Sequence, residues 1–171
     1  ITSSEHKSGT DRVNEVAVIE NWSDEMIIVN LQGDNALMPS ANIDQVAKLL
    51  FDNPSYSIAT LGTDFLSKDE EEDRNAVKVF INKETNEAIT FKRNLKHYEK
   101  QSVNYLRHIG VYAYTRSSLR TFSDSDASIE EENEKLEQLR AYGLKLRIIV
   151  GKASVTPGPD VDTYEDLLLV K

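Results

Sequence analysis

Two aspartates are placed where a carboxylate could hold a metal ion. Asp34 follows the apolar run 26–31 and the dipeptide Gln32-Gly33, and Asp162 lies in a turn close to the end of the sequence. Ligands of open α/β sheets bind beside the carboxyl ends of the strands, and Mg²⁺ prefers carboxylate oxygens. An aspartate after a strand is more often a turn or capping residue. Spacing alone therefore leaves both a metal site and a turn open.

The composition excludes several other kinds of chemistry. The 171 residues include no cysteine, which rules out disulfides, thiolate metal sites and cysteine nucleophiles and suits a reducing cytoplasm. A formal charge of −9 argues against a nucleic-acid partner, because such a partner needs clustered Lys and Arg. No apolar stretch approaches the roughly 20 residues that span a bilayer, so we expect no membrane association.

Hydrophobic periodicity predicts alternating helices and strands. Helices are expected at residues 11–21, 39–52, 128–143 and 163–170. Strands are expected at residues 26–31, 57–62, 77–82, 86–92, 106–115 and 146–150. The polar segment 64–75 reads as a loop or a short helix, and the continuous apolar run 26–31 is typical of a central strand buried on both faces.

Interleaved helices and strands predict a three-layer α/β architecture with a mixed sheet. A chain of 171 residues is long enough for one sizeable core and short for two. No internal repeat or low-complexity linker divides it. We therefore expect a single α/β domain over residues 1–171.

Five segments, taken in order, resemble the pattern of the CMP-Kdo synthetases, the cytidylyltransferases that activate 3-deoxy-manno-octulosonate (Kdo). They are HKSGTDR at 6–12, IVNLQGD at 28–34, NAVKV at 75–79, RHIGVYAY at 107–114 and LEQLR at 136–140. A degenerate DVDTYEDL at 160–167 closes the series. Because order and spacing agree from end to end, the chain is identified by resemblance as a member of this family. The resemblance implies a Rossmann-like sheet of the nucleotide-diphospho-sugar-transferase type.

The resemblance also implies an activity, namely transfer of a cytidylyl group from CTP to Kdo or a related 3-deoxy sugar acid for lipopolysaccharide synthesis in the cytoplasm. Charge is the physical difficulty, since an anionic sugar must approach a polyphosphate. Mg²⁺ meets it by neutralising oxygens and orienting in-line attack. Asp34 and Asp162 lie in the two segments where the family keeps its metal-binding aspartates, so they are the expected catalytic and metal-binding residues.

For the nucleotide, segment 6–12 is similar to the family's cytosine-side loop. The expected contacts are His6, Ser8, Gly9 and Arg12. Gly9 would let the backbone approach the base closely. The alternative is an ordinary loop in which Thr10 or Asp11 caps the following helix, and one loop can serve both purposes.

For the sugar, the resemblance points to Gln32, Arg93, His108, Tyr112, Glu137 and Gln138. The Arg93 guanidinium suits the Kdo carboxylate, and amide, carboxylate and imidazole groups suit its hydroxyls. His108 lies in a predicted strand, where a hydrogen-bonded core histidine is the alternative. Glu137 and Gln138 lie on a predicted charged helix, for which a solvated face is the default.

The chain departs from the family pattern in several places. The glycine-rich, basic strand and loop that hold the CTP triphosphate are absent before Ile1, so we expect an N-terminally truncated version of the fold. The family's Gln-Gly-Asp-Glu-Pro becomes QGDNA at 32–36, and its Ser-Arg with the following Ala-Pro-Ile-Pro becomes KRNLKH at 92–97. The alternative function is therefore a non-catalytic relative that binds or assembles on the same scaffold. The family also implies a homodimer, and segment 92–104 lies near its expected contacts.

Overall fold

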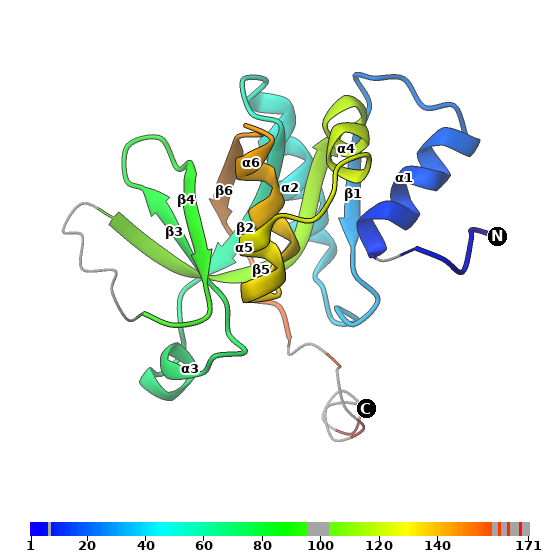
Figure 1. Cartoon of the computed structure of the whole chain (residues 1–171). Helices are drawn as coiled ribbons and strands as arrows, with labels where there is room; N and C mark the ends of the chain where they lie inside the picture. The colour runs from blue at the N-terminus through cyan, green and yellow to red at the C-terminus, as the bar shows by residue number, and fades with distance from the viewer. Residues whose placement is uncertain (7, 96–102, 159–160, 162–163, 165–167, 169–171) are drawn as a thin grey trace.

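Six strands form one mixed sheet in the computed structural model, which describes residues 1–6, 8–95, 103–158, 161, 164 and 168 (Figure 1). The strands are β1 (Ile27–Leu31), β2 (Ile58–Thr63), β3 (Lys78–Asn82), β4 (Ala88–Lys92), β5 (Val103–Thr115) and β6 (Ile148–Lys152). Their order is β4-β3-β5-β2-β6, with β1 added to β5. The β2–β6 ladder is parallel and the others are antiparallel. The six strands predicted from the sequence are confirmed, each within three residues of its expected ends.

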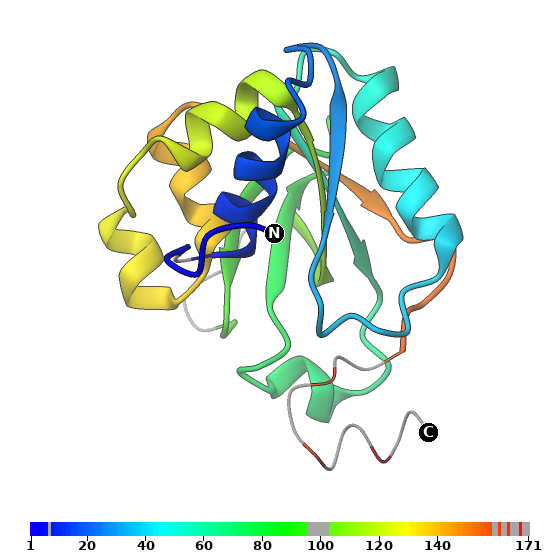
Figure 2. The ribbon, with the colours of Figure 1, turned by 90° about the vertical axis from the view of Figure 1, so that its right-hand side faces the viewer.

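Helices cover both faces of this sheet (Figure 2). They are α1 (Gly9–Ile19), α2 (Ser40–Asp52), α3 (Lys68–Glu72), α4 (Arg116–Ser123), α5 (Ile129–Glu134) and α6 (Arg140–Gly143), with a 3₁₀ turn η1 (Glu137–Leu139) before α6. On one face α2 buries Val46 and Leu50, which lie four residues apart on one side of the helix. On the other face, α1 and α4 bury Ala17 and Phe122. This confirms the three-layer α/β architecture.

The sheet forks along β5, and the fork makes room for a site. Strand β3 pairs with residues 103–107 of β5, and β1 pairs with residues 111–115. Strand β2 runs along residues 107–114 on the opposite edge. The ladders of β1 and β3 therefore share one edge of β5 and leave residues 108–110 between them. His108 donates its backbone N–H to the Val77 carbonyl at 2.8 Å, where the β3 ladder ends.

One helical prediction is wrong, and one helix was missed. The expected helix 128–143 is broken, because Lys135 adopts a left-handed conformation (φ 55°) and Leu136 is extended. The capping box at Ser128 is confirmed. However, α5 buries none of its residues, so no packing against the core stabilises a longer helix. Helix α4 was not predicted, because its short sequence RSSLRTFS is mostly polar and follows β5 without a connecting loop.

Strand β1 pairs with β5 and with no other strand among the described residues, which differs from the expected central position. Its faces are nevertheless covered, since Ile28 belongs to one core and Val29 packs against the other. Most of the expected C-terminal helix 163–170 lies outside the described residues. No helix in the described part of the chain is long and apolar enough to cross a membrane.

Candidate active site

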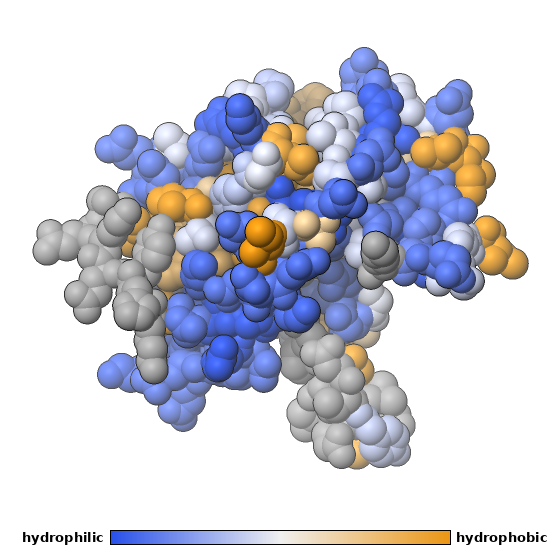
Figure 3. All heavy atoms as spheres, in the orientation of Figure 1, coloured by the Kyte–Doolittle hydropathy of each residue, from blue (hydrophilic) through white to orange (hydrophobic). Residues whose placement is uncertain are grey.

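A cavity of about 780 Å³ opens where the ladders of β1 and β3 separate. Its lining comes from the segment after β1, from residues 107–114 within β5, from α3 and the segment after it, and from residues 135–138 at the start of η1. Figure 3 shows that the surface over α3 and α5 on this side of the molecule is mostly hydrophilic. The lining includes the polar and charged side chains of Gln32, Asp34, Asn35, Glu70, Asp73, Arg107, His108, Tyr112, Lys135, Glu137 and Gln138.

A second hollow, of about 560 Å³, adjoins the first. It is lined by the start of α1, with Ser8, Gly9 and Arg12, and by residues 30–34 at the end of β1. Gln32, Asp34 and Glu137 line both spaces. The structure thus brings two adjoining cavities together at three polar side chains.

Asp34 lies at this junction, just past the end of β1. Its Oδ1 accepts a hydrogen bond from Asn35 Nδ2 at 2.9 Å, and its backbone carbonyl accepts one from Val161 N–H at 2.9 Å. Among the described residues no group of three or more His, Asp or Glu side chains could hold a metal. One aspartate suits a Mg²⁺ that completes its shell with phosphates and water. Asp162, the other predicted metal ligand, lies outside the described residues.

His108 joins the core to the larger cavity. Its Nε2 is 3.0 Å from Thr60 Oγ1, and its ring packs edge-on against Phe91 at 5.1 Å and beside Tyr112 at 5.3 Å. Burial lowers the pKa of His108 to about 3, so the ring is neutral at physiological pH. Because Thr60 Oγ1 donates to the Val111 carbonyl at 2.8 Å, its oxygen accepts from Nε2–H, which leaves Nδ1 as an acceptor. His108 is therefore a hydrogen-bonded core histidine that also lines the cavity, and its contact with a sugar stays a prediction.

Glu137 projects from η1 into the junction, and a short chain of hydrogen bonds holds it. Asn30 Nδ2 donates to Thr10 Oγ1 at 3.2 Å, and Thr10 Oγ1 donates to Glu137 Oε2 at 3.1 Å. The other oxygen, Oε1, is buried and has no hydrogen-bond partner within the described part of the chain. Burial raises the pKa of Glu137, while hydrogen bonds from the Ser8 and Thr10 side chains oppose the rise. The default of a solvated face is thus wrong for this residue.

Tyr112 and Gln138 complete the wall of the larger cavity. Both are buried, at 6% and 8% exposure, and Tyr112 comes from β5 while Gln138 comes from η1. Burial raises the pKa of the Tyr112 phenol, so the hydroxyl stays neutral and can donate a hydrogen bond. Gln32, His108, Tyr112, Glu137 and Gln138 are thus brought together, as five of the six predicted sugar residues.

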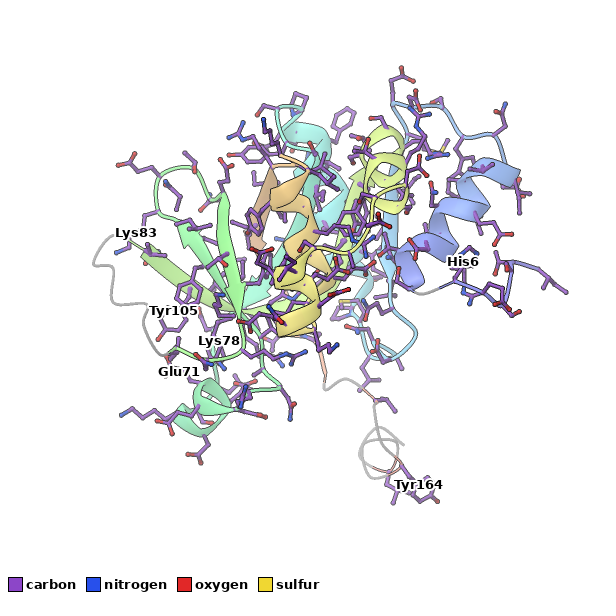
Figure 4. All side chains as sticks on the ribbon, viewed as in Figure 1. His6, Glu71, Lys78, Lys83, Tyr105 and Tyr164 are labelled. Carbon is purple, nitrogen blue, oxygen red and sulfur yellow. The ribbon has the colours of Figure 1, made fainter. Side chains whose placement is uncertain are left out.

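The predicted nucleotide residues divide into two groups. Ser8, Gly9 and Arg12 line the smaller hollow, and Ser8 also caps α1 by accepting from Asp11 N–H at 3.2 Å. The cap is thus Ser8 and not Thr10 or Asp11, as the sequence had suggested, and the loop serves both as a helix cap and as a cavity wall. Arg12 Nη1 donates to Thr2 Oγ1 at 2.6 Å and to the Ser3 carbonyl at 2.9 Å. His6 lies outside the hollow's lining, on the N-terminal segment, and its Nε2 pairs with the Glu15 carboxylate on α1 (Figure 4).

Arg93, the sixth predicted sugar residue, does not line the cavity. Its Nε, Nη2 and Nη1 donate to the carbonyls of Glu134 (2.9 Å), Lys135 (3.1 Å) and Arg74 (3.2 Å). It thereby holds the end of α5, from which the turn carrying Glu137 begins.

Lys78 continues this support from β3. Its side chain is fully buried, and Nζ donates to the carbonyls of Asp73 at 2.6 Å and Arg93 at 3.3 Å. Burial lowers the pKa of Lys78. Near it, the Tyr105 hydroxyl donates to the Glu71 carboxylate of α3 (Figure 4). Lys78 and Arg93 together join the segment after α3 to the end of α5, and both segments contribute to the cavity wall.

Sequence reasoning missed three groups at the site. Asn35 was noted only as a substitution, yet its amide contacts Asp34. Arg107 and Lys135 also line the cavity. Arg107 stands beside His108 in the matched segment 107–114, which was a usable signal. Lys135 reaches the wall only because the predicted helix breaks there, and no pattern indicated this break.

Known proteins resemble this chain over nearly its full length. The sequence profile of a family described as Cytidylyltransferase matches residues 1–148. The 3-deoxy-manno-octulosonate cytidylyltransferase of Acinetobacter baumannii (strain AYE) is 40% identical over 98% of this chain and 69% of its own length. The protein of the same name from Polynucleobacter asymbioticus is 37% identical over 100% and 69%.

A solved structure agrees as well. CMP:2-keto-3-deoxy-manno-octonic acid synthetase complexed with CTP superimposes with a TM-score of 0.87 and 33% identity, covering 99% of this chain and 68% of that one. Fold and sequence thus lead to one conclusion. The chain belongs to the 3-deoxy-manno-octulosonate cytidylyltransferase (CMP-Kdo synthetase) family.

Proposed function

We propose that this chain transfers the cytidylyl group of CTP to Kdo, or to a closely related 3-deoxy sugar acid, and releases pyrophosphate for lipopolysaccharide synthesis. The observation that carries the proposal is the pair of adjoining cavities that share Gln32, Asp34 and Glu137. A two-substrate transfer needs such a junction, because the reacting atoms must be held in contact. The names of the relatives support the same reaction.

The nucleotide is assigned to the smaller hollow and the sugar acid to the larger cavity. Ser8 and Gly9 bound the nucleotide side, while Tyr112 and Gln138 present hydrogen-bonding groups on the sugar side. Asp34 at the junction would hold Mg²⁺, which when bound supplies charge neutralisation for the phosphate oxygens. Glu137, whose Oε1 is unpaired among the described residues, is positioned to accept a hydrogen bond from a sugar hydroxyl.

One contact favours the alternative of a non-catalytic relative that binds ligands on the same scaffold. Asn35, which replaces the Glu of the family pattern, donates to Asp34 Oδ1. This bond occupies part of the acceptor capacity that a metal would use. Activity and binding must therefore be measured separately.

The test is pyrophosphate release by this chain with CTP, Mg²⁺ and Kdo, against the same mixture without Kdo. Sugar-dependent release is expected from the wild type and is expected to vanish in Asp34→Asn. Asp52→Asn is the matched control, because Asp52 lies on α2 and pairs with Lys48 (2.9 Å between Nζ and Oδ2), outside the lining of both cavities. Release that persists in Asp34→Asn would refute the metal assignment. CTP and Kdo binding without release would favour the non-catalytic alternative.

Two wider properties remain predictions from the family. We expect a cytoplasmic protein and a homodimer. Light scattering of the purified chain measures the second, and a monomer at micromolar concentration would contradict it.

A further inference from the structure

The larger cavity presents an electrostatic problem for the substrate just proposed, and the inference below rests on that proposal. A sugar acid carries a carboxylate, whereas acidic residues outnumber basic ones in the described lining. The acidic residues are Asp34, Glu70, Asp73 and Glu137, and the arginine and lysine are Arg107 and Lys135. An anion entering this space needs one of these cations as a partner.

Arg93 is poorly placed to be that partner. Each of its three guanidinium nitrogens donates to a backbone carbonyl at 2.9–3.2 Å, and it is absent from the described lining. Turning Arg93 toward a ligand would leave the carbonyls at the end of α5 without their donor. The lost hydrogen bonds would destabilise the turn that carries Glu137 and Gln138, and both of these residues belong to the proposed sugar site.

Arg107 has the opposite environment. It lies on β5 beside His108, opposite Lys78 at the last pair of the β3 ladder, and its side chain is 20% exposed. Glu70 Oε1 is 3.2 Å from Nε, yet the buried Nε–H is not aligned for a hydrogen bond to any group in the described chain. The other Glu70 oxygen already accepts from Leu66 N–H at 2.7 Å. Arg107 therefore has N–H donors at the cavity wall that could bind a ligand.

We infer that Arg107 binds the carboxylate of the sugar acid and that Glu70 holds the guanidinium in place while the cavity is empty. A guanidinium presents parallel N–H groups that match the two oxygens of a carboxylate, which a lysine ammonium such as that of Lys135 cannot do. The desolvation of Arg107 is largely complete in the folded chain, so an arriving carboxylate meets a preorganised partner. This contact selects anionic over neutral sugars.

The test compares Kdo with its methyl ester, in which a neutral and slightly larger group replaces the carboxylate, by isothermal titration calorimetry. The wild type is expected to bind Kdo at least about tenfold more tightly than the ester. Arg107→Gln should weaken Kdo binding by about 10- to 100-fold, the range of a charged hydrogen-bonded pair, and leave ester binding within about twofold. Arg107→Lys, which keeps the charge without the fork, should retain part of the preference.

Two further variants test the role of Glu70 and provide a control. Glu70→Gln removes the competing carboxylate and should bind Kdo at least as tightly as the wild type. Arg74→Gln is the matched control, because Arg74 is exposed and lies outside the lining, and its backbone carbonyl, which the substitution keeps, accepts from Arg93. It should bind both ligands as the wild type does.

An unchanged preference for Kdo over the ester in Arg107→Gln would overturn the inference and leave the proposed function standing. Loss of the preference in Arg93→Gln alone would overturn it in favour of Arg93. A wild-type chain that binds neither ligand would contradict the proposed function itself, and the inference would fall with it.

Discussion

Arg140 and Arg147 make nearly the same contacts, but Arg140 is more deeply buried. Replacing each with methionine separates the effect of burial on stability from the effect of contact geometry. Arg140 Nε and Nη2 donate to the two oxygens of Glu131 at 2.8 and 2.6 Å, and its guanidinium lies 4.7 Å from the centre of the Phe122 ring. Arg147 donates to both oxygens of Glu87 at 3.1 and 2.7 Å and lies 4.3 Å from the Tyr56 ring.

Burial distinguishes the two pairs. The side chains of Arg140 and Glu131 are 10% and 12% exposed, whereas those of Arg147 and Glu87 are 46% and 31% exposed. Arg140 Nη1 also donates to the carbonyls of Phe122 and Ser125, both at 3.3 Å. Arg140→Met therefore removes the charged partner of a buried carboxylate, which keeps only the Ser128 N–H as a donor, and it removes the donor of the Ser125 carbonyl. This loss costs about 3 kcal/mol. For a chain of this size each kcal/mol lowers Tm by about 2–4 °C, so the expected loss is about 6–12 °C.

The assay is thermal unfolding followed by circular dichroism, with urea unfolding as a second measure. Arg147→Met, the control, should lower Tm by no more than about 2 °C, because solvent screens its pair. Equal losses in the two variants would refute the reasoning, since contact geometry and not burial would then set the cost. A small loss in Arg140→Met alone would mean that Glu131 finds water when its partner is removed.

Three other predictions follow from groups at the site. Because burial lowers the pKa of His108 to about 3, the unfolded chain binds a proton below about pH 6.5 that the folded chain does not bind. The free energy of unfolding should therefore be highest above that pH and should fall as the pH drops towards 3. Urea unfolding at pH 7 and 5 should show a smaller fall in His108→Gln than in the wild type. Burial raises the pKa of Glu137, so its ionisation lowers the stability of the folded chain as the pH rises through that pKa. Glu137→Gln should therefore raise Tm more at pH 8 than at pH 5 and should abolish sugar-dependent turnover. An equal rise in Tm at both pH values would contradict this prediction. Lys78→Met leaves the Asp73 and Arg93 carbonyls without their donor, so the KM for the sugar should rise more than kcat falls, and an unchanged KM would show that Lys78 does not support the cavity wall.

The sequence was most informative where one physical pattern ran over many residues. Alternating and continuous apolar runs predicted all six strands, because covering a sheet with helices demands those patterns. The capping box at Ser128 was equally reliable as a start signal. It could not indicate where α5 ends, because the end depends on burying Leu136 in a core formed by distant elements.

The same limit applies to the site. His108 and Tyr112 were found because they lie in a long matched strand. Arg93 was predicted to contact the sugar, yet its donors face the carbonyls at the end of α5, and that arrangement follows from the helix break at Lys135. Residue type indicated which chemistry was available, whereas the direction of each side chain depended on packing between elements far apart in the sequence.

The fork in the sheet has a consequence for changing what this scaffold recognises. Tyr112 and Leu136 on the cavity wall belong to the hydrophobic core, so substituting them endangers folding. Gln32, Asp73 and Lys135 instead lie beyond the ends of strands and helices, where backbone ladders have already stopped. A combinatorial library confined to those terminal positions would sample new ligand preferences at little cost in foldability. In such a forked sheet, the binding residues that can be exchanged are different residues from those that stabilise the fold.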